Sequence, residues 1–145
     1  MFEKLNHIEL SGERYPIKCD LLVLEKIQDE YGDLSDFENK LTGFVPDVDE
    51  YGEYVRNEEG LLVGKRKTPE IKILRKALIW MIEEGMEIEG ETGEHELNEK
   101  EIMRKADMSP GELSRILHEE FNRCFKRKNG QTTQGNLKET ENQKK

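Results

Sequence analysis

The residues with the most recognisable chemical pattern are acidic and lie near the middle of the chain. Four positions of a twelve-residue calcium-binding loop, the first, third, sixth and twelfth, carry suitable residues: Asp47, Asp49, Gly52 and Glu58. The fifth position should be Asp or Asn but is Tyr51, and Pro46 interrupts the helix that should precede the loop. Because the ligand set and its helical context are both incomplete, we expect no metal site here.

A second pattern, over residues 98–125, has the rhythm of a helix-turn-helix DNA-binding motif. Asn98 caps a short helix, and a tight turn leads to a second helix whose start is marked by Ser109 and Pro110. Three residues depart from the motif, in the first helix, in the turn and at the start of the recognition helix: Met103, Asp107 and Glu112. Because of these departures, a DNA-binding regulator or adaptor that uses residues 98–125 is the alternative function and not the first one.

No set of side chains with catalytic or ligand spacing is found elsewhere. The histidines lie in three separate segments, at His7, His95 and His118. Cys19 and Cys124 form no CxxC pair, and we expect two reduced, half-buried core thiols. The sequence contains no nucleophile elbow, zinc-peptidase motif, P-loop or dinucleotide-binding motif. We therefore expect a protein that is not an enzyme and that holds no cofactor.

Composition and charge indicate which partners suit this chain. It has 145 residues, of which 34% are hydrophobic and 38% are charged, and its net charge is −9. Residues 1–125 carry 17 basic and 30 acidic side chains, whereas residues 126–145 carry 6 basic and 2 acidic ones. A strongly acidic body repels phosphate, so nucleic-acid and anionic-membrane binding are disfavoured. No apolar run approaches the ~20 residues of a membrane span, and we expect a cytoplasmic protein.

The N-terminal part predicts a hairpin followed by two helices. Apolar residues alternate over residues 5–10 and 14–19, on either side of a turn signal, which predicts a β-hairpin. Helical spacing predicts a helix over residues 21–31, with Asp20 as its cap. A capping box that begins at Ser35 predicts a short helix ending near residue 41.

Residues 43–68 interrupt these patterns with glycines and acids, and we interpret them as an insertion that is partly ordered at best. Residues 54–55 and 61–63 have the composition to pair as a second hairpin around residues 57–60. A segment of this length without strong periodicity is unusual in a compact domain and tends to be functional or disordered.

The strongest helix follows the insertion. Thr68 is its expected cap, Pro69 its first residue, and Gly85 its end. Residues 77–82 are apolar on nearly every side, which predicts either the centre of the domain or a seam between subunits. Residues 83–101 carry nine acids and one lysine and predict a solvated linker.

The C-terminal part predicts two capped helices and a basic tail. The second helix keeps its apolar period until Phe125, and residues 126–145 have the composition of a disordered segment. The predicted fold class is therefore mainly α (α+β). Residues 1–125 are expected to form one domain with an N-terminal β-hairpin, about five helices and an acidic insertion.

Three stretches, over residues 15–34, 76–85 and 97–125, together resemble the tail assembly chaperones of long-tailed bacteriophages and prophages. The shared features are a strand and a helix that ends in Tyr31-Gly32, an apolar central helix around Trp80, and the two capped helices. The insertion at residues 43–68 departs from the shorter members of the family.

The resemblance implies a small acidic protein that coats the phage tape-measure protein and keeps it soluble in the cytoplasm of the bacterial host until tube subunits polymerise. It also implies recruitment of the tail tube protein by longer products of the same gene. We further expect that the protein can self-associate. Five apolar residues stand isolated in acidic segments, and we expect them to contact the partner: Leu61, Leu62, Val63, Met86 and Ile88.

Overall fold

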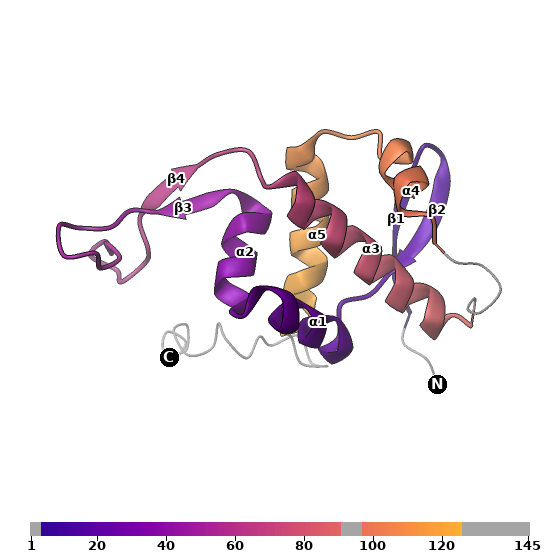
Figure 1. The fold of residues 1–145 in the computed structure, drawn as a ribbon, viewed down its shortest axis with the longest axis horizontal. Coiled ribbons are helices and arrows are strands. Elements are labelled where there is room, and N and C mark those ends of the chain that lie inside the picture. The colour runs from indigo at the N-terminus through magenta and orange to yellow at the C-terminus, as the bar shows by residue number, and fades with distance from the viewer. Residues whose placement is uncertain (1–3, 91–96, 126–145) are drawn as a thin grey trace.

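The computed structural model describes residues 4–90 and 97–125, so the tail predicted over residues 126–145 lies outside the described part (Figure 1). At the N-terminus, β1 (Asn6–Leu10) pairs with β2 (Glu13–Ile17) in an antiparallel hairpin. The connecting turn has positive φ angles at Ser11 (52°) and Gly12 (82°), which match the twist of a two-residue hairpin turn. The predicted hairpin is confirmed.

Within the described residues, five helices follow the hairpin, as the sequence predicted for a mainly α fold. Their bounds are α1 (Leu21–Tyr31), α2 (Leu34–Thr42), α3 (Ile71–Ile88), α4 (Glu99–Lys105) and α5 (Pro110–Arg123). Two short strands, β3 (Phe44–Pro46) and β4 (Gly64–Arg66), lie between α2 and α3 and pair antiparallel. The helices and the first hairpin share one hydrophobic core.

The centre of this core is α3. It packs against β2 and against each of the other four helices, and Figure 1 shows it crossing the body. Seven of its apolar side chains are buried: Ile73, Leu74, Ala77, Leu78, Ile79, Met81 and Ile82. A helix surrounded in this way buries residues on nearly every side, which explains why residues 77–82 lack a polar face.

Gly85 does not end α3, contrary to the sequence prediction, and the helix continues to Ile88. The glycine is there because β2 passes close to the helix. A Cβ atom at Gly85 would lie 2.7 Å from both the carbonyl carbon and the oxygen of Pro16. The backbone N–H of Lys18 donates to the carbonyl of Met81, one turn earlier, at 3.0 Å. Gly85 therefore permits a backbone contact between hairpin and helix.

Three predicted helix caps are present. The side chains of Asp20, Asn98 and Ser109 each accept a hydrogen bond from the backbone N–H three residues later, at 3.1–3.2 Å. These bonds satisfy N–H groups that have no partner within the helix, so each helix begins where its cap predicts.

Two predicted helix starts are wrong. The cap of α2 is Asp33, whose Oδ1 accepts from the N–H of Ser35, so Ser35 lies inside the helix. The cap position of α3 is Glu70, and Thr68 and Pro69 precede the helix. The N–H of Glu70 donates to the carbonyl of Lys40 at the end of α2, which holds this segment extended and delays the start of α3.

The acidic stretch over residues 83–101 is not simply a linker. Its first part forms the last turns of α3, its last residues begin α4, and residues 91–96 lie outside the described part. The last turns of α3 and the first turn of α4 carry exposed carboxylates, which is why the charge pattern resembled that of a solvated linker.

A buried carboxylate attaches α5 to the hairpin. Glu120 is 1% exposed and accepts hydrogen bonds from the side-chain amide of Asn6 (3.2 Å) and the N–H of Cys19 (3.1 Å). Arg123 pairs with the same carboxylate at 2.6 Å. The thiols of Cys19 and Cys124 are also hydrogen-bonded to each other, although they are far apart in sequence. These contacts hold the C-terminal end of α5 against the first hairpin and the residue Cys19 that follows it.

Candidate interaction surface

Residues 44–66 form an arm that projects from the helical body, with β3 and β4 as its base (Figure 1). Phe44, Val45 and Pro46 pair with Arg66, Lys65 and Gly64 respectively. A Cβ at Gly64 would lie 2.3 Å from the carbonyl oxygen of Val45 and 2.7 Å from the ring of Phe44. Gly64 therefore lets the Phe44 ring and the Val45 carbonyl lie close to the backbone of β4.

Beyond its base the arm divides at a ring of three backbone hydrogen bonds. The N–H of Asp47 donates to the carbonyl of Val63, that of Val63 to Val55, and that of Val55 to Asp47, at 2.8–3.0 Å. Two short hairpins leave this ring, and we call residues 48–54 lobe one and residues 56–62 lobe two. Each is held by one β-bridge, Val48 to Tyr54 in lobe one and Arg56 to Leu62 in lobe two.

The turn of each lobe is held by the same pattern of side-chain hydrogen bonds. Oδ1 of Asp49 accepts from the N–H groups of Tyr51 and Glu53, and Oδ1 of Asn57 accepts from those of Glu59 and Leu61, at 2.9–3.0 Å. A glycine with positive φ completes each turn, Gly52 in lobe one and Gly60 in lobe two. Lobe two is the hairpin predicted around residues 57–60, whereas lobe one and the β3–β4 pairing were not predicted. The signal that was missed is an eight-residue spacing of Asx-x-x-Gly.

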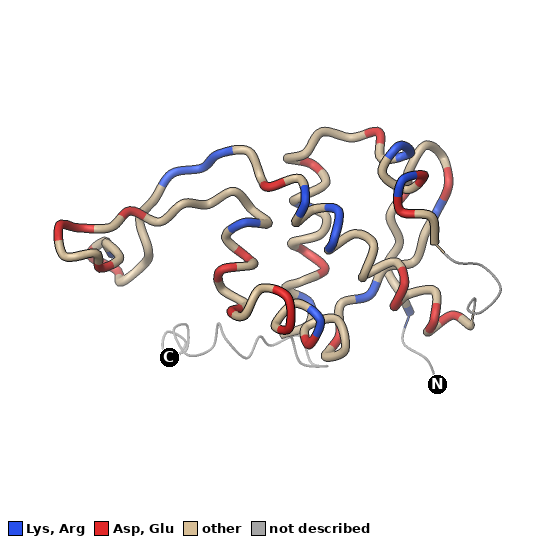
Figure 2. The backbone as a smooth tube through the Cα atoms, in the orientation of Figure 1, with Lys and Arg blue, Asp and Glu red and all other residues tan. Residues whose placement is uncertain are grey.

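The arm exposes apolar side chains among carboxylates. Nine large apolar side chains are exposed in the described part of the chain, and five belong to the arm: Val45, Val48, Tyr51, Tyr54 and Leu61. Tyr51 is 80% exposed. Six acids lie between Asp47 and Glu59, and Figure 2 shows them as red segments at the outer end. Apolar groups concentrated on a projecting element indicate a contact surface for another molecule.

The structure separates the five residues that the sequence singled out for partner contact. Leu61 is exposed on lobe two, and Leu62 and Val63 beside it are half-buried. Met86 packs partly against the core, and Ile88 is exposed at the C-terminal end of α3. Figure 1 shows the arm and this end of α3 at opposite ends of the molecule. They therefore form two surfaces rather than one site.

The residues of the calcium-loop pattern serve the arm's own backbone. Oδ1 of Asp49 is occupied by two N–H groups, the backbone of Asp47 belongs to the three-bond ring, and Glu58 lies in the other lobe. Within residues 4–90 and 97–125, no group of three or more His, Cys, Asp or Glu side chains is arranged to hold a metal ion.

The helix-turn-helix candidate presents carboxylates on its second helix. On the exposed face of α5, Arg115 pairs with Glu112 at 2.6 Å and with Glu119 at 2.8 Å. The Arg115 guanidinium holds the pKa of the Glu112 carboxyl below its ordinary value. This face of α5 offers one cation whose charge two carboxylates neutralise, so it is unsuited to binding the phosphate backbone of DNA.

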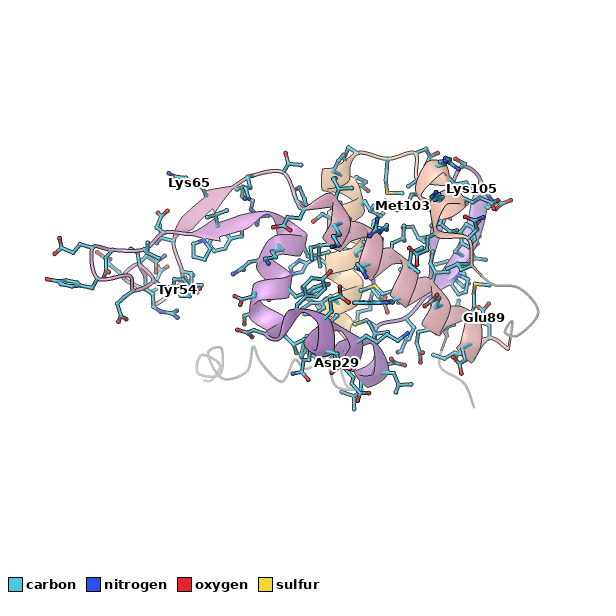
Figure 3. All side chains as sticks on the ribbon, viewed as in Figure 1. Asp29, Tyr54, Lys65, Glu89, Met103 and Lys105 are labelled. Atoms are coloured by element: carbon cyan, nitrogen blue, oxygen red, sulfur yellow. The ribbon has the colours of Figure 1, made fainter. Side chains whose placement is uncertain are left out.

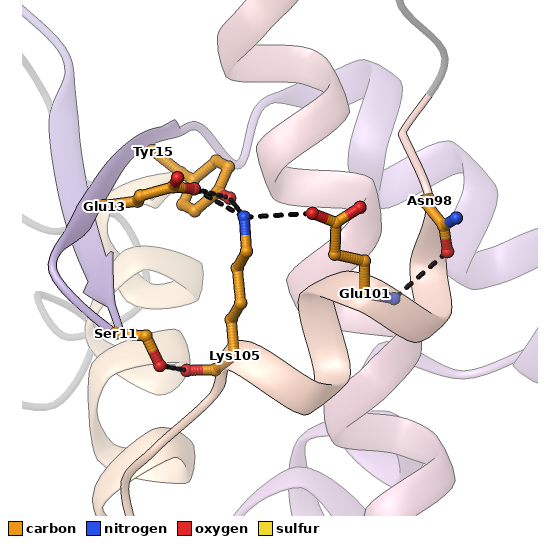
Figure 4. Close-up of polar contacts among 6 residues, drawn as sticks. All are labelled: Ser11, Glu13, Tyr15, Asn98, Glu101 and Lys105. Carbon is orange, nitrogen blue, oxygen red and sulfur yellow. Dashed lines mark hydrogen bonds and ion pairs between the residues drawn. The ribbon is translucent and has the colours of Figure 1, made fainter.

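A polar cluster joins α4 to the first hairpin (Figure 4). Nζ of Lys105 lies 2.6 Å from Glu13, 3.1 Å from the Tyr15 hydroxyl and 3.2 Å from Glu101. The Ser11 hydroxyl donates to the Lys105 carbonyl at 2.7 Å. The hydrogen bond to Glu13 is the main cause that raises the pKa of Lys105. Every group here has a partner, so we interpret the cluster as a tether for α4.

Comparison with known proteins gives no relative: family models, curated proteins and solved structures all lack a match to this chain. Among the described residues, no helix combines the length and apolar character needed to cross a membrane.

Proposed function

We propose that this protein is a non-enzymatic tail assembly chaperone that binds the tape-measure protein of a long-tailed phage and keeps it soluble. The observation that carries the proposal is the arm, which presents five exposed apolar side chains within an acid-rich segment outside the core. The resemblance of residues 15–34, 76–85 and 97–125 to such chaperones supports the choice of partner.

The chemistry of the arm suits a long, helical and aggregation-prone partner. Tyr51, Tyr54 and Leu61 supply apolar contact area, while the neighbouring carboxylates keep the complex hydrated. The three-bond ring fixes the backbone from which both lobes project before binding, which reduces the entropy lost on association. A long partner can also reach Ile88 at the far end of α3, so this residue stays in the proposed contact surface.

DNA binding through residues 98–125 is the alternative, and the exposed face of α5 gives it little support. The exposed face of α5 carries Glu112 and Glu119 on either side of Arg115. Retention on duplex DNA that falls steeply with salt would favour the alternative.

Co-expression with the candidate tape-measure protein tests the proposal. The arm variant replaces four exposed residues by serine: Val48, Tyr51, Tyr54 and Leu61. The matched control replaces Leu21 and Leu22, which are 78% and 59% exposed on α1. We expect the wild type and the control to keep the long partner soluble and to co-purify with it, and the arm variant to lose both effects. Equal rescue by all three chains, or rescue by none, would contradict the proposal.

A further inference from the structure

The body carries a basic groove between the start of α3 and α4. It has a volume of about 840 Å³, and its basic side chains are Lys72 and Arg75 from α3 and Lys100 and Arg104 from α4. Glu99 is the one acid among the described residues of its lining, and Ile71 and Met103 add apolar surface. Figure 2 shows the blue segments on both helices. This concentration of positive charge contrasts with the acidic chain around it.

Three of the four cations of the groove have no partner in the described part of the chain. Lys72, Lys100 and Arg104 form no ion pair or hydrogen bond there, whereas Lys76 and Lys105 nearby are both paired. Nε of Arg75 is buried and makes no hydrogen bond. A buried donor without an acceptor costs free energy, so the groove suits a ligand that brings carboxylates.

Lobe one of the arm has the complementary chemistry. Residues 48–54 carry Asp49, Glu50 and Glu53 and no basic residue, with Tyr51 almost fully exposed among them. Lobe two is less suitable, because it carries Arg56, whose guanidinium donates to the Gly60 carbonyl at 2.8 Å. A tyrosine between carboxylates can place its ring on Ile71 and Met103 while its neighbours pair with the cations.

The arm cannot fill the groove of its own chain. Figure 3 shows Tyr54 on the arm at one end of the molecule, with Met103 and Lys105 toward the other. The β3–β4 base and the segment that leads to α3 direct the arm away from α4 (Figure 1). An occupant from the arm must therefore come from a second molecule.

We propose that the protein self-associates head to tail, with lobe one of one copy seated in the α3–α4 groove of the next. Such an interface joins two different surfaces, so each added copy leaves one free lobe and one free groove. The product is an open chain of copies, or a ring if the rotation closes. The inference does not rest on the tape-measure partner, because both complementary surfaces belong to this chain.

Charge reversal with sedimentation velocity of the full chain tests the interface. One variant carries Glu50→Lys and Glu53→Lys, the other Lys72→Glu and Lys100→Glu. All four side chains are exposed, and a glutamate suits the first turn of α3 and of α4. We expect the average molecular mass of the wild type to rise with protein concentration. Each variant should associate at least roughly tenfold more weakly than the wild type.

An equimolar mixture of the two variants gives the decisive result. In the mixture, the basic lobe one of the first variant can bind the acidic groove of the second. The acidic lobe one of the second variant can also bind the basic groove of the first. Association should therefore return. Each double reversal changes the net charge of −9 by four, so both variants stay negative and general attraction cannot explain a rescue. The matched control, Glu58→Lys with Glu59→Lys in lobe two, should associate like the wild type. A wild type that stays monomeric, or a mixture that stays dissociated, would overturn the proposal.

Discussion

Replacement of Gly85 by alanine tests how the hairpin and α3 are held together. In an exposed helix, this change stabilises a protein by about 1 kcal/mol, because alanine has the higher helix propensity. Here the new Cβ would lie 2.7 Å from two backbone atoms of Pro16, a distance that real Cβ atoms do not show. Neither partner is a flexible side chain, so β2 must move away from α3.

The expected cost follows from that displacement. Forcing a methyl group into a packed contact costs about 1–3 kcal/mol. Movement of β2 also weakens the hydrogen bond from Lys18 to Met81, which contributes about 1 kcal/mol. After subtraction of the propensity gain, we expect Gly85→Ala to lower the free energy of unfolding by about 1–3 kcal/mol.

Urea denaturation followed by circular dichroism measures this difference, and Gly111 provides the matched control. Gly111 lies in the first turn of α5, and a Cβ there would meet nothing within 4 Å. Gly111→Ala should leave stability unchanged or raise it by up to about 1 kcal/mol. If Gly85→Ala were as stable as Gly111→Ala, the close contact between β2 and α3 would be wrong.

Three further predictions concern polar groups that join separate elements of the fold. A hydrogen bond to Asp20, with burial, raises the pKa of Glu84 from 4.5 to about 7, so this bond stabilises the fold at low pH and is lost as pH rises through about 7. Stability should therefore fall by about 1–2 kcal/mol between pH 5 and pH 8 after allowance for solvent screening, and Glu84→Gln should remove that dependence in urea titrations at each pH. Diamide should oxidise the adjacent Cys19 and Cys124 thiols to a disulfide. The mass of the protein, measured after denaturation, should fall by two hydrogens, and the free energy of unfolding should rise by about 2–4 kcal/mol. An unchanged mass would refute the contact between the two thiols. Glu120→Ala should lower the free energy of unfolding by about 2–4 kcal/mol, because it leaves the buried N–H of Cys19 without an acceptor, and a loss below 1 kcal/mol would contradict that role.

The sequence predicted the start of a helix correctly where the side chain of a single capping residue sets it. Asp20, Asn98 and Ser109 cap their helices through their own side chains, so residue type and spacing were sufficient. The start of α3 was misplaced because the bond from Glu70 to Lys40 depends on how α2 packs. Gly85 was misread for the same reason, since a glycine that permits a close contact looks in sequence like one that ends a helix.

The candidate surface was only partly predictable. Apolar residues among acids indicated partner contact at residues 61–63, and Leu61 is indeed exposed, but Leu62 and Val63 turn partly inward. Tyr51 was not singled out, because its exposure follows from the ring of backbone bonds that splits the arm into two lobes. The basic groove was missed because its cations come from helices that lie apart in sequence.

Hydrogen–deuterium exchange on the purified complex with the tape-measure protein tests the central claim most directly. The arm should hold the partner, so exchange in the exposed turns over residues 48–62 should slow at least several-fold on binding, while the start of α1 at Leu21 and Leu22 should exchange as in the free protein. Protection confined to α4 and α5, or an arm whose exchange is unchanged in a stable complex, would contradict the account.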